Sequence, residues 1–364
     1  MTGPKTNVDA AELESYFAKE LGVHVIGTEL LNDGLNQVVA VSTDAAENAY
    51  VLRRPRKLRH TGYMNDLKQE YEVLGRLRET PIAAPEPVAF CADESVLGDC
   101  FFVTAYVEGT TVPLGSDLPE RFRNPNSRRT LADCLIGTLA EIHSLNVEPF
   151  EGVCERRPPR EQVTRCTDRL EAATDLMCYD PLAFRPVADW LQRNVPPDPE
   201  TTLIHGDFRP GNVLFAGQDV PEITGVLDWE TACLGDPLVE LGYLLLRWHD
   251  DGDPTPSLDR LESRYPDADA VEELREQNER GLVPFTARPG SPSRRELVAR
   301  YETETGRSFE NERFYRAYAA FALATVWADL HRNRREAGEE SNWEPYVEYM
   351  LLLAERIVDG AFER

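Results

Sequence analysis

The spacing of apolar residues changes near residue 109, and this change constrains the fold more than any other feature of the sequence. Before it, after a helix that begins near Asp9, apolar residues form short runs bounded by turn-forming residues, a pattern typical of antiparallel strands. Five such runs occur, at 24–31, 37–42, 49–53, 88–91 and 100–107. A second helix is predicted over 66–79. The sequence therefore predicts a small α+β lobe over residues 1–108.

Beyond residue 109 the apolar residues repeat at helical spacing over long stretches. Helices are predicted at 127–146, 160–178, 181–194, 313–332 and 343–363. Short strand-like runs interrupt them, at 202–204, 213–215 and 225–228. The chain is therefore expected to be a bilobal α+β protein, with a larger and mainly helical lobe over residues 109–364.

The chain is strongly acidic, with 39 basic and 64 acidic residues and a formal net charge of −25. Such a surface repels phosphate backbones, which argues against nucleic acid as a partner. The sequence has only four lysines, at positions 5, 19, 57 and 68, so arginine supplies nearly all the positive charge. Acidic, lysine-poor surfaces are typical of halophilic proteins, in which salt screens the self-repulsion of the chain. An ordinary acidic enzyme is the alternative.

The sequence also allows a prediction of the cellular compartment in which the protein resides. No run of 18 consecutive apolar residues is present, and no apolar signal core follows the N-terminus. These features favour a cytoplasmic protein without a membrane span. The seven cysteines are odd in number and form no C-x-x-C pair, so we expect reduced, mostly buried thiols rather than disulfides or a zinc site.

Three polar residues stand at the ends of short apolar runs in the larger lobe. His205-Gly206-Asp207 follows the run 202–204, Asn212 precedes the next run, and Asp228 ends the third. Phosphoryl transfer needs a carboxylate that accepts the proton of the attacking hydroxyl, and oxygen ligands that hold Mg²⁺. Asp207 suits the first role, whereas Asn212 and Asp228 suit the second. Because the connecting loop is short, we expect the three to face one cavity.

Each of these residues also has a structural explanation when it is taken alone. His205 suits a core histidine bonded to backbone, and Asp207 and Asp228 suit turn caps. Their joint occurrence at strand ends, with this spacing, favours a catalytic site over three unrelated structural roles.

The same residues resemble a known family. His205-Gly206-Asp207, Asn212 and Leu227-Asp228-Trp229 are similar to the motifs of the aminoglycoside phosphotransferase and choline kinase-like family, which has the protein-kinase-like fold. The segments 91–98, 106–109 and 234–238 resemble the subgroup of kinase-like domains associated with acyl-CoA dehydrogenases. The resemblance extends over about residues 25–335. It implies that the small lobe binds ATP or GTP and that the large lobe carries catalysis, with Mg²⁺ as cofactor.

In this family a cation on the third strand, held by a carboxylate of the inserted helix, positions the phosphates of the nucleotide. Arg53 and Glu70 occupy these places, with arginine where lysine is usual. Arg54 is a second candidate for the cation. Because side chains alternate along a strand, only one of the two arginines can face the nucleotide. Both could also be solvated surface charges.

Two further segments of the small lobe resemble nucleotide-binding elements. Gly34 and Asn36, between the first two strands, are expected to place hydrogen-bond donors over the phosphates, although a turn with one glycine also suits a plain hairpin. Tyr106 and Val107 resemble the hinge whose backbone binds the base.

Three residues near the catalytic motifs have expected roles as well. Arg209 is expected either to stabilise the transferring phosphate or to hold the catalytic loop by an ion pair, and the ion pair is favoured. Trp229 occupies the place of an apolar packing residue. Asp236, directly before Pro237, is expected to cap a helix.

The interval between Asp228 and Asp236 is too short for a segment that docks a peptide, which favours a small acceptor with a hydroxyl group. Its pocket is expected to be lined by the loop 284–293 and by four side chains: Tyr315, Tyr318, Trp327 and Arg332. An acidic pocket would favour an amino sugar or a choline-like cation, whereas an arginine-lined pocket would favour an anion such as a hydroxyacyl-CoA.

Two alternatives to an active kinase stay open at this point. One is a nucleotide-binding regulator without turnover, and the other is a non-catalytic helical interaction protein. The sequence leaves the choice of ATP or GTP, and the oligomeric state, equally open.

Overall fold

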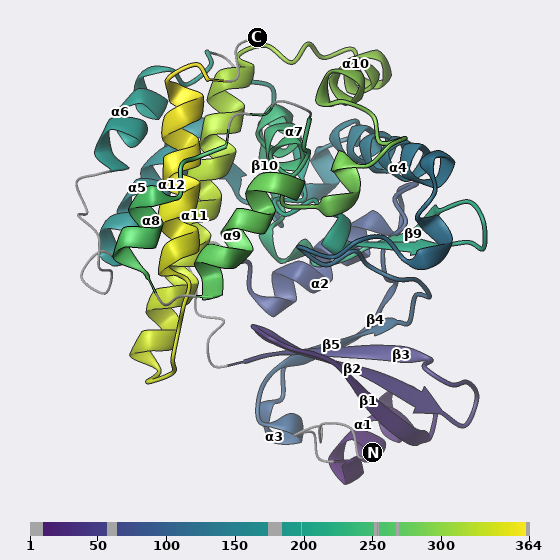
Figure 1. Cartoon of the computed structure of the whole chain (residues 1–364). Helices are drawn as coiled ribbons and strands as arrows, with labels where there is room; N and C mark the ends of the chain where they lie inside the picture. The colour runs from purple at the N-terminus through teal and green to yellow at the C-terminus, as the bar shows by residue number, and fades with distance from the viewer. Residues whose placement is uncertain are drawn as a thin grey trace.

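The computed structural model describes residues 10–56, 64–173, 184–197, 199–250, 253, 255–266 and 269–361. A twisted sheet lies at one end of the molecule, and the helices of the C-terminal part fill the other end (Figure 1). This is the bilobal α+β arrangement that the sequence predicted.

The sheet of the small lobe is antiparallel and contains the five predicted strands within a few residues. Its spatial order is β1 (Val25–Asp33), β2 (Asn36–Thr43), β3 (Tyr50–Pro55), β5 (Phe101–Ala105) and β4 (Pro87–Cys91). The short helix α3 (Glu94–Leu97), where only a turn was expected, connects β4 to β5. The proposed start of the first helix at Asp9 lies outside the described residues, and α1 spans Ala10–Glu20.

The two faces of this sheet belong to different cores. One face packs on α1 and α3 in a small apolar core that contains Leu13, Phe17, Val41, Leu52 and Phe101. The other face meets α2 (Leu67–Leu77), whose apolar residues join the core of the large lobe. Because α2 packs on β4, β5 and the turn after Asp228, it fixes the position of the sheet relative to that segment of the large lobe.

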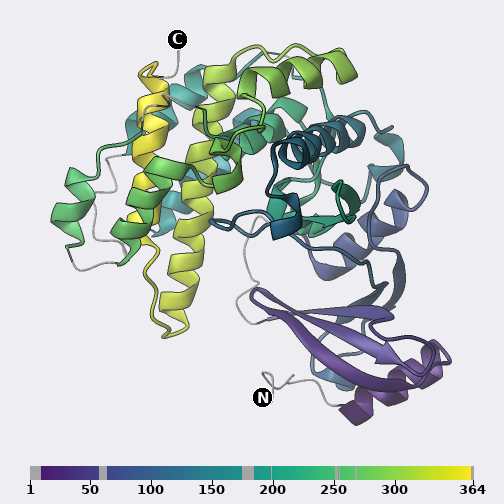
Figure 2. The ribbon, with the colours of Figure 1, turned by 45° about the vertical axis from the view of Figure 1, so that its right-hand side comes forward.

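Helices dominate the large lobe. The 25-residue α11 (Glu312–Glu336) packs against α5 (Pro159–Ala173), α7 (Pro237–Leu246) and α12 (Glu344–Val358), and α12 runs beside it in Figure 2. α4 (Pro125–His143) packs against α10 (Arg294–Thr305). The remaining described helices are α6 (Arg185–Arg193), α8 (Asp259–Arg264) and α9 (Asp269–Arg280). The predicted helices 127–146, 181–194 and 343–363 end earlier than expected, whereas the helix predicted at 313–332 extends to Glu336. The end of the run 160–178 lies outside the described residues.

The short strands of the large lobe form two separate sheets. β6 (Arg156–Arg157), β10 (Cys233–Gly235) and β7 (Thr202–Ile204) pair in that order, whereas β8 (Val213–Ala216) and β9 (Glu222–Val226) form a hairpin. The predicted runs at 202–204 and 213–215 therefore lie in different sheets. The loop between them carries the predicted catalytic residues.

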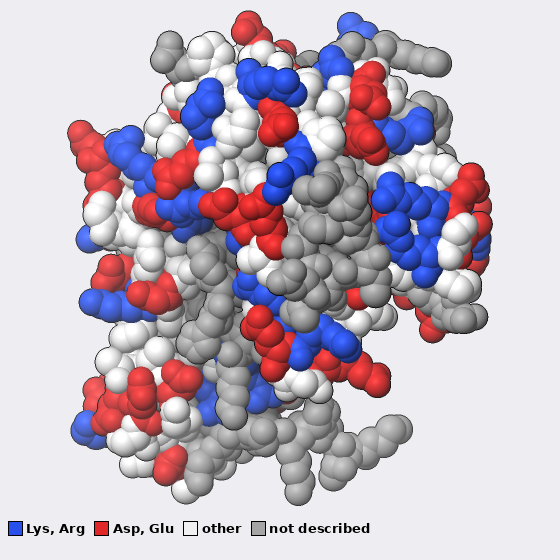
Figure 3. Space-filling model, turned by 90° about the vertical axis from the view of Figure 1, so that its left-hand side faces the viewer, with Lys and Arg blue, Asp and Glu red and all other residues white. Residues whose placement is uncertain are grey.

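The surface and the thiols agree with a reduced, charged globular protein. The face in Figure 3 carries acidic and basic side chains side by side. Six cysteines of the described part are free thiols, and Cys178 lies outside it. None of the described helices combines the length and the apolarity that crossing a membrane would require.

Candidate active site

The backbone of the loop after β7 is held from two sides. The His205 ring is fully buried, and its Nε2 lies 2.7 Å from the carbonyl oxygen of Leu227. Gly206 has a φ of 87°, and a Cβ there would lie 2.6 Å from the carbonyl oxygen of Thr231, so this position requires glycine. Glu240 of α7 accepts the backbone N–H bonds of His205 and Gly206, at 2.9 and 2.5 Å.

Three side chains donate hydrogen bonds to the carboxylate of Asp207. Asn212 Nδ2 lies 2.7 Å and Arg209 Nε lies 3.1 Å from Oδ2, while the phenol of Tyr243 donates to Oδ1. The structure therefore brings together the predicted Asp207, Arg209 and Asn212, and the expected ion pair of Arg209 is present. Because Asn212 uses its amide nitrogen for Asp207, its carboxamide oxygen is the atom available to a metal.

Asp228 follows β9 with a left-handed backbone conformation, at φ 62° and ψ 55°. Its carboxylate forms an ion pair with Arg53. Burial by itself would raise the pKa of Asp228, but the charges of Arg53 and Arg209 outweigh this effect and hold the pKa below its ordinary value. The carboxylate therefore stays ionised at neutral pH, which is the form that a divalent cation binds.

Arg53 is a buried hub for three carboxylates. Its Nε lies 3.2 Å from Glu70 of α2, the partner that the sequence indicated, and it also pairs with Asp228 and Glu230. Arg54 points to the opposite face of β3, where it donates to Gln37 at 2.8 Å and to the carbonyl of Leu97 at 2.7 Å. Arg53 is therefore the arginine that faces the catalytic segments, and neither of the two is a solvated surface charge.

The other predicted residues of the small lobe lie at the ends of its strands. Asn36, at the start of β2, is buried and donates to Glu230 at 2.7 Å. Gly34 forms the preceding turn, where a Cβ would meet only the side chain of Asn32, at 3.6 Å. Tyr106 and Val107 follow β5, and the Tyr106 N–H donates to Ala49 at 3.0 Å.

A metal fits this arrangement only together with a phosphate ligand. No group of three or more His, Cys, Asp or Glu side chains in the described part of the chain could hold a metal alone. Asn212 and Asp228 offer two oxygen ligands from neighbouring segments, since the Leu227 N–H donates to the Asn212 carbonyl at 2.8 Å. Mg²⁺ commonly takes one or two such protein ligands and completes its shell with phosphate and water. The residues present therefore fit a Mg²⁺ ion bound together with a nucleotide.

A cavity of about 430 Å³ opens beside Asp207, Arg209 and Asp228. Its far wall comes mainly from α5, α7 and α11. The apolar side chains that α11 contributes include Ala319, Ala322, Leu323, Val326, Trp327 and Leu330, and the cavity is also lined by Arg157 of β6, Arg169 of α5 and Arg247 at the end of α7.

The prediction of the pocket wall was correct for two side chains and wrong for the others. Tyr318 and Trp327 line the cavity. Tyr315 does not, because it lies against Gly242 of α7 and its buried hydroxyl donates to Asp236 at 2.7 Å.

Arg332 and the loop 284–293 also lie away from the cavity. Arg332 pairs with Asp329 on its own helix, 2.5 Å away, and therefore does not reach the cavity wall. The loop 284–293 packs instead on the start of α4, where a Cβ at Gly290 would overlap Pro125. Asp236 itself accepts the N–H of Leu238 at 2.9 Å and caps α7 as predicted.

Sequence reasoning missed a polar stripe on α7. Glu240, Tyr243 and Arg247 follow one another at helical spacing and face the catalytic loop and the cavity. The guanidinium of Arg247 stacks 3.7 Å from the centre of the Tyr243 ring. The signal in the sequence was the appearance of Glu240 and Tyr243 inside an otherwise apolar helix, with Arg247 directly after its last residue. Sequence reasoning also missed Glu230, two residues after Asp228, which forms an ion pair with Arg53.

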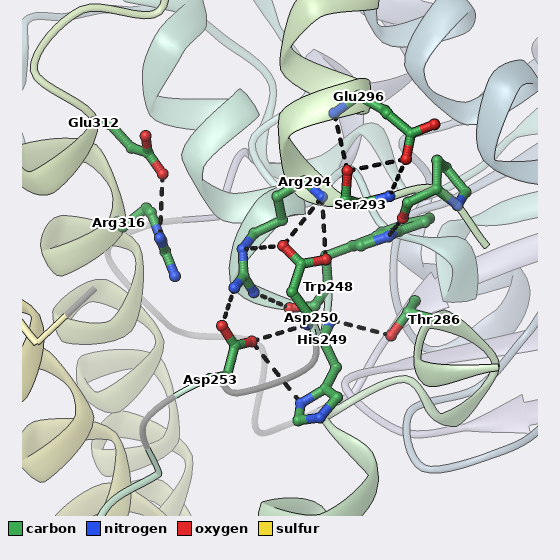
Figure 4. Close-up of polar contacts among 11 residues, drawn as sticks. Trp248, His249, Asp250, Asp253, Thr286, Ser293, Arg294, Glu296, Glu312 and Arg316 are labelled. Carbon is green, nitrogen blue, oxygen red and sulfur yellow. Dashed lines mark hydrogen bonds and ion pairs between the residues drawn. The ribbon is translucent and has the colours of Figure 1, made fainter. Parts of the chain in front are cut away.

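The C-terminal end of α7 is anchored by a buried arginine of α10. Arg294, at the start of α10, donates to the carbonyl of Trp248 and pairs with Asp253 and with Asp250, the latter at 3.3 Å (Figure 4). The Trp248 indole donates to Pro292 at 2.6 Å. These contacts fix the residue next to Arg247 and therefore the place of Arg247 in the cavity wall.

Comparison with known proteins adds a family and several relatives. Residues 27–276 match the model of a family described as "Phosphotransferase enzyme family". Human acyl-CoA dehydrogenase family member 11 is 31% identical over 206 residues, which are 54% of this chain and 25% of that protein. Mouse acyl-CoA dehydrogenase family member 10 is 26% identical over 337 residues, or 91% of this chain and 29% of that protein. The chain thus spans about a quarter of the length of these relatives.

Solved structures share the fold at low sequence identity. A candidate aminoglycoside phosphotransferase from Ralstonia eutropha superposes with a TM-score of 0.70 at 22% identity, over 98% of this chain and 99% of that one. The choline kinase LicA from Streptococcus pneumoniae gives a TM-score of 0.57 at 16% identity, over 97% and 98% of the two chains. The fold of this chain is therefore the kinase-like fold of these proteins.

Proposed function

Since the chain belongs to the phosphotransferase enzyme family, we propose that it transfers the γ-phosphate of ATP or GTP to a hydroxyl group of a small acceptor. Asp207 is the catalytic base in this proposal. It accepts the proton of the acceptor hydroxyl while the hydroxyl oxygen attacks the γ-phosphorus. Asn212 and Asp228 hold Mg²⁺, which neutralises charge on the phosphates when it is bound. Arg53, held by Glu70, contacts the phosphates.

One observation carries this proposal. Asp207 receives hydrogen bonds from Arg209 and Asn212 at the edge of a cavity that Asp228 also lines. A carboxylate at the mouth of a cavity, next to two oxygen ligands for a metal, can activate a hydroxyl beside a metal-bound phosphate. A non-catalytic helical interaction protein would need neither the cavity nor this arrangement.

The charges of the cavity favour an anionic acceptor. Of the carboxylates that line it, Asp207, Asp228 and Glu230 belong to the catalytic segments, and Glu240 is occupied by backbone N–H groups. The helical wall contributes arginines and apolar side chains. Arginine binds carboxylates and phosphates well, whereas an amino sugar or a choline-like cation would be repelled. We therefore favour an acceptor that combines a hydroxyl, an apolar portion and a negative charge, as a hydroxyacyl-CoA does.

A second cavity lies next to this one. It has a volume of about 630 Å³ and shares Leu35 and Leu330 with the first cavity. Its charged lining consists of three arginines, Arg54, Arg56 and Arg334, and three carboxylates, Asp33, Asp99 and Glu339. An acceptor long enough to reach this second cavity would meet no excess of either charge there.

The proposal is tested by phosphorylation of a panel of acceptors with Mg²⁺ and either ATP or GTP, in high salt. The panel contains hydroxyacyl-CoA thioesters, homoserine, choline and kanamycin. We expect the thioesters to be the best substrates. Asp207→Asn should lower kcat by about 10²- to 10⁴-fold, the usual contribution of a general base. Asp189→Asn, an exposed change of the same type on α6, serves as the control.

Two outcomes would contradict parts of this proposal. Tight binding of nucleotide without phosphorylation of any acceptor would favour the regulator without turnover. Equal activity of Asp207→Asn and the wild type would remove Asp207 from the role of base.

A further inference from the structure

Tyr243 occupies the place on Asp207 that an acceptor hydroxyl needs. Arg209 and Asn212 both donate to Oδ2, and the phenol of Tyr243 is the donor to Oδ1. An acceptor hydroxyl must reach the carboxylate at hydrogen-bond distance before it can give up its proton. Oδ1, the carboxylate oxygen to which Arg209 and Asn212 do not donate, is thus already hydrogen-bonded to the hydroxyl of Tyr243.

The phenol remains a donor over the whole physiological pH range. Burial raises the pKa of Tyr243 above its ordinary value, and the charge of Asp207 acts in the same direction against the opposing charge of Arg247. Tyr243 is therefore neutral, and able to donate, at physiological pH. The hydrogen bond between Tyr243 and Asp207 holds whenever nothing else competes for Oδ1.

We propose that Tyr243 is a gate on the catalytic base, which shields Asp207 from water until an acceptor displaces the phenol. The proposal rests on the proposed function, because it requires Asp207 to be the base. Without the gate, a water molecule can take the place of the acceptor. Asp207 then accepts a proton from the water, whose oxygen bonds to the γ-phosphorus. The bond from that phosphorus to the bridging oxygen breaks, and ADP and phosphate leave.

The neighbouring arginine links this gate to the acceptor. Arg247 is almost fully buried, lines the cavity, stacks on the Tyr243 ring and donates to the Tyr243 carbonyl at 2.9 Å. Its Nε has no hydrogen-bond partner among the residues that the structure describes. An anionic group of the acceptor that binds Arg247 therefore acts on the cation that stacks on the tyrosine ring. Binding of the correct acceptor and displacement of the Tyr243 phenol from Asp207 would then occur together.

The test measures hydrolysis of ATP with Mg²⁺ and without any acceptor. Tyr243→Phe keeps the ring and its stacking on Arg247 but removes the hydroxyl. We expect this variant to hydrolyse ATP at least about 10-fold faster than the wild type, since an accessible general base contributes about 10²- to 10⁴-fold. Adding Asp207→Asn to Tyr243→Phe should abolish the increase.

Tyr349→Phe is the matched control. Tyr349 of α12 lies outside the cavity, and its phenol also donates one hydrogen bond to a side chain, to Asn278 Oδ1 at 2.7 Å. This variant should hydrolyse ATP at the wild-type rate. A melting curve and the affinity for ADP, measured for every variant, show that the fold and the nucleotide site are intact.

The gate is overturned if Tyr243→Phe hydrolyses ATP no faster than the wild type while its melting curve and ADP affinity are unchanged. A loss of phosphorylation of a hydroxyacyl-CoA without any gain in hydrolysis would also overturn it, because Tyr243 would then only orient Asp207. Failure of the proposed function has a different signature, namely an Asp207→Asn variant that still phosphorylates the acceptor.

Discussion

The two halves of the catalytic cavity are built in different ways. The half that carries Asp207, Asn212 and Asp228 comes from two short segments of sequence, each placed at the end of a strand. The opposite half comes from α5, α7 and α11, which are separated by up to about half of the chain and meet only through packing. Backbone hydrogen bonds and a required glycine fix the first half, whereas helix contacts fix the second.

This difference teaches which part of the chemistry can vary. In the proposed function, the first half would act on the phosphate and on the proton of the attacking hydroxyl. The second half would contact the acceptor, and its side chains could change without any change in the segments that carry Asp207 and Asp228. We therefore expect variants of the first half to affect turnover and variants of the second half to affect the choice and affinity of the acceptor.

The largest effect on stability is expected from Arg53, the hub of the first half. Arg53→Met removes the cation that Glu70, Asp228 and Glu230 share and leaves three carboxylates close together. Breaking a buried ion pair in this way costs about 3–5 kcal/mol of unfolding free energy. Loss of a cation from the phosphates should also lower kcat/KM by about 100-fold.

Arg54→Met provides the comparison for this variant, since it changes the neighbouring residue on the opposite face of β3. Urea unfolding and steady-state kinetics of both variants check the prediction. Similar losses in the two variants would show that the two faces of β3 do not differ in function, which would contradict the separate roles of Arg53 and Arg54.

A smaller effect is expected in the second half. Arg247→Met should raise the KM for an anionic acceptor by about 10- to 100-fold, the value of a hydrogen bond to a charged group, while the affinity for nucleotide stays the same. Arg129→Met, which removes an exposed arginine paired with Glu296 on the surface, is the control. A lower affinity for nucleotide, with an unchanged KM for the acceptor, would contradict the assignment of Arg247 to the second half of the cavity.

Glu240 of α7 joins the two halves, because it accepts hydrogen bonds from the loop that leads to Asp207. Its contribution to stability can be tested by varying the pH. Burial would raise the pKa of Glu240, but its hydrogen bonds with His143 and with the catalytic loop lower it below the ordinary value of 4.5. A group with a depressed pKa stabilises the fold above its unfolded value, and this stability is lost as the pH falls through the folded value. The acid limb of a stability–pH curve should therefore contain a contribution from Glu240.

Glu240→Gln should remove that contribution and cost about 1–3 kcal/mol at neutral pH, because an amide cannot accept all of these hydrogen bonds. Urea unfolding between about pH 3 and pH 7 measures both effects. Glu141→Gln, an exposed change on α4, should leave the curve unchanged. An acid limb that is the same in Glu240→Gln and the wild type would contradict the assignment.

The smallest effect concerns the surface outside both halves. If the net charge of −25 destabilises the fold by self-repulsion, salt should raise the melting temperature. We expect an increase of about 4 °C or more between dilute buffer and molar KCl, which corresponds to roughly 3 kcal/mol for a chain of this size. The acidic and basic side chains that stand side by side in Figure 3 would limit the effect. A melting temperature that does not respond to KCl would contradict the halophilic interpretation.

Much of the fold could be predicted from local patterns. The five strands and the helix α2 follow from apolar spacing and turn residues, because both signals act over a few residues. The approach of Asn212 to Asp207 also follows from a short loop. The same argument separates Arg53 from Arg54, since neighbouring residues on a strand point to opposite faces.

The remaining features were decided by tertiary contacts. Tyr315 and Tyr318 are three residues apart on α11, yet one is buried against α7 and the other lines the cavity. No local signal distinguishes them, because the difference depends on where α7 crosses α11. The bond of Tyr243 to Asp207 joins residues 36 positions apart and depends on the same packing.

By itself, then, the sequence determined the elements and the order of the catalytic groups along the chain, because backbone geometry and local spacing govern both. Only the tertiary structure decided which side chains line the cavity beside Asp207 and which side chains donate hydrogen bonds to its carboxylate. Those contacts form when distant helices bury their apolar faces together, and the energy of that burial depends on the whole arrangement rather than on any one segment.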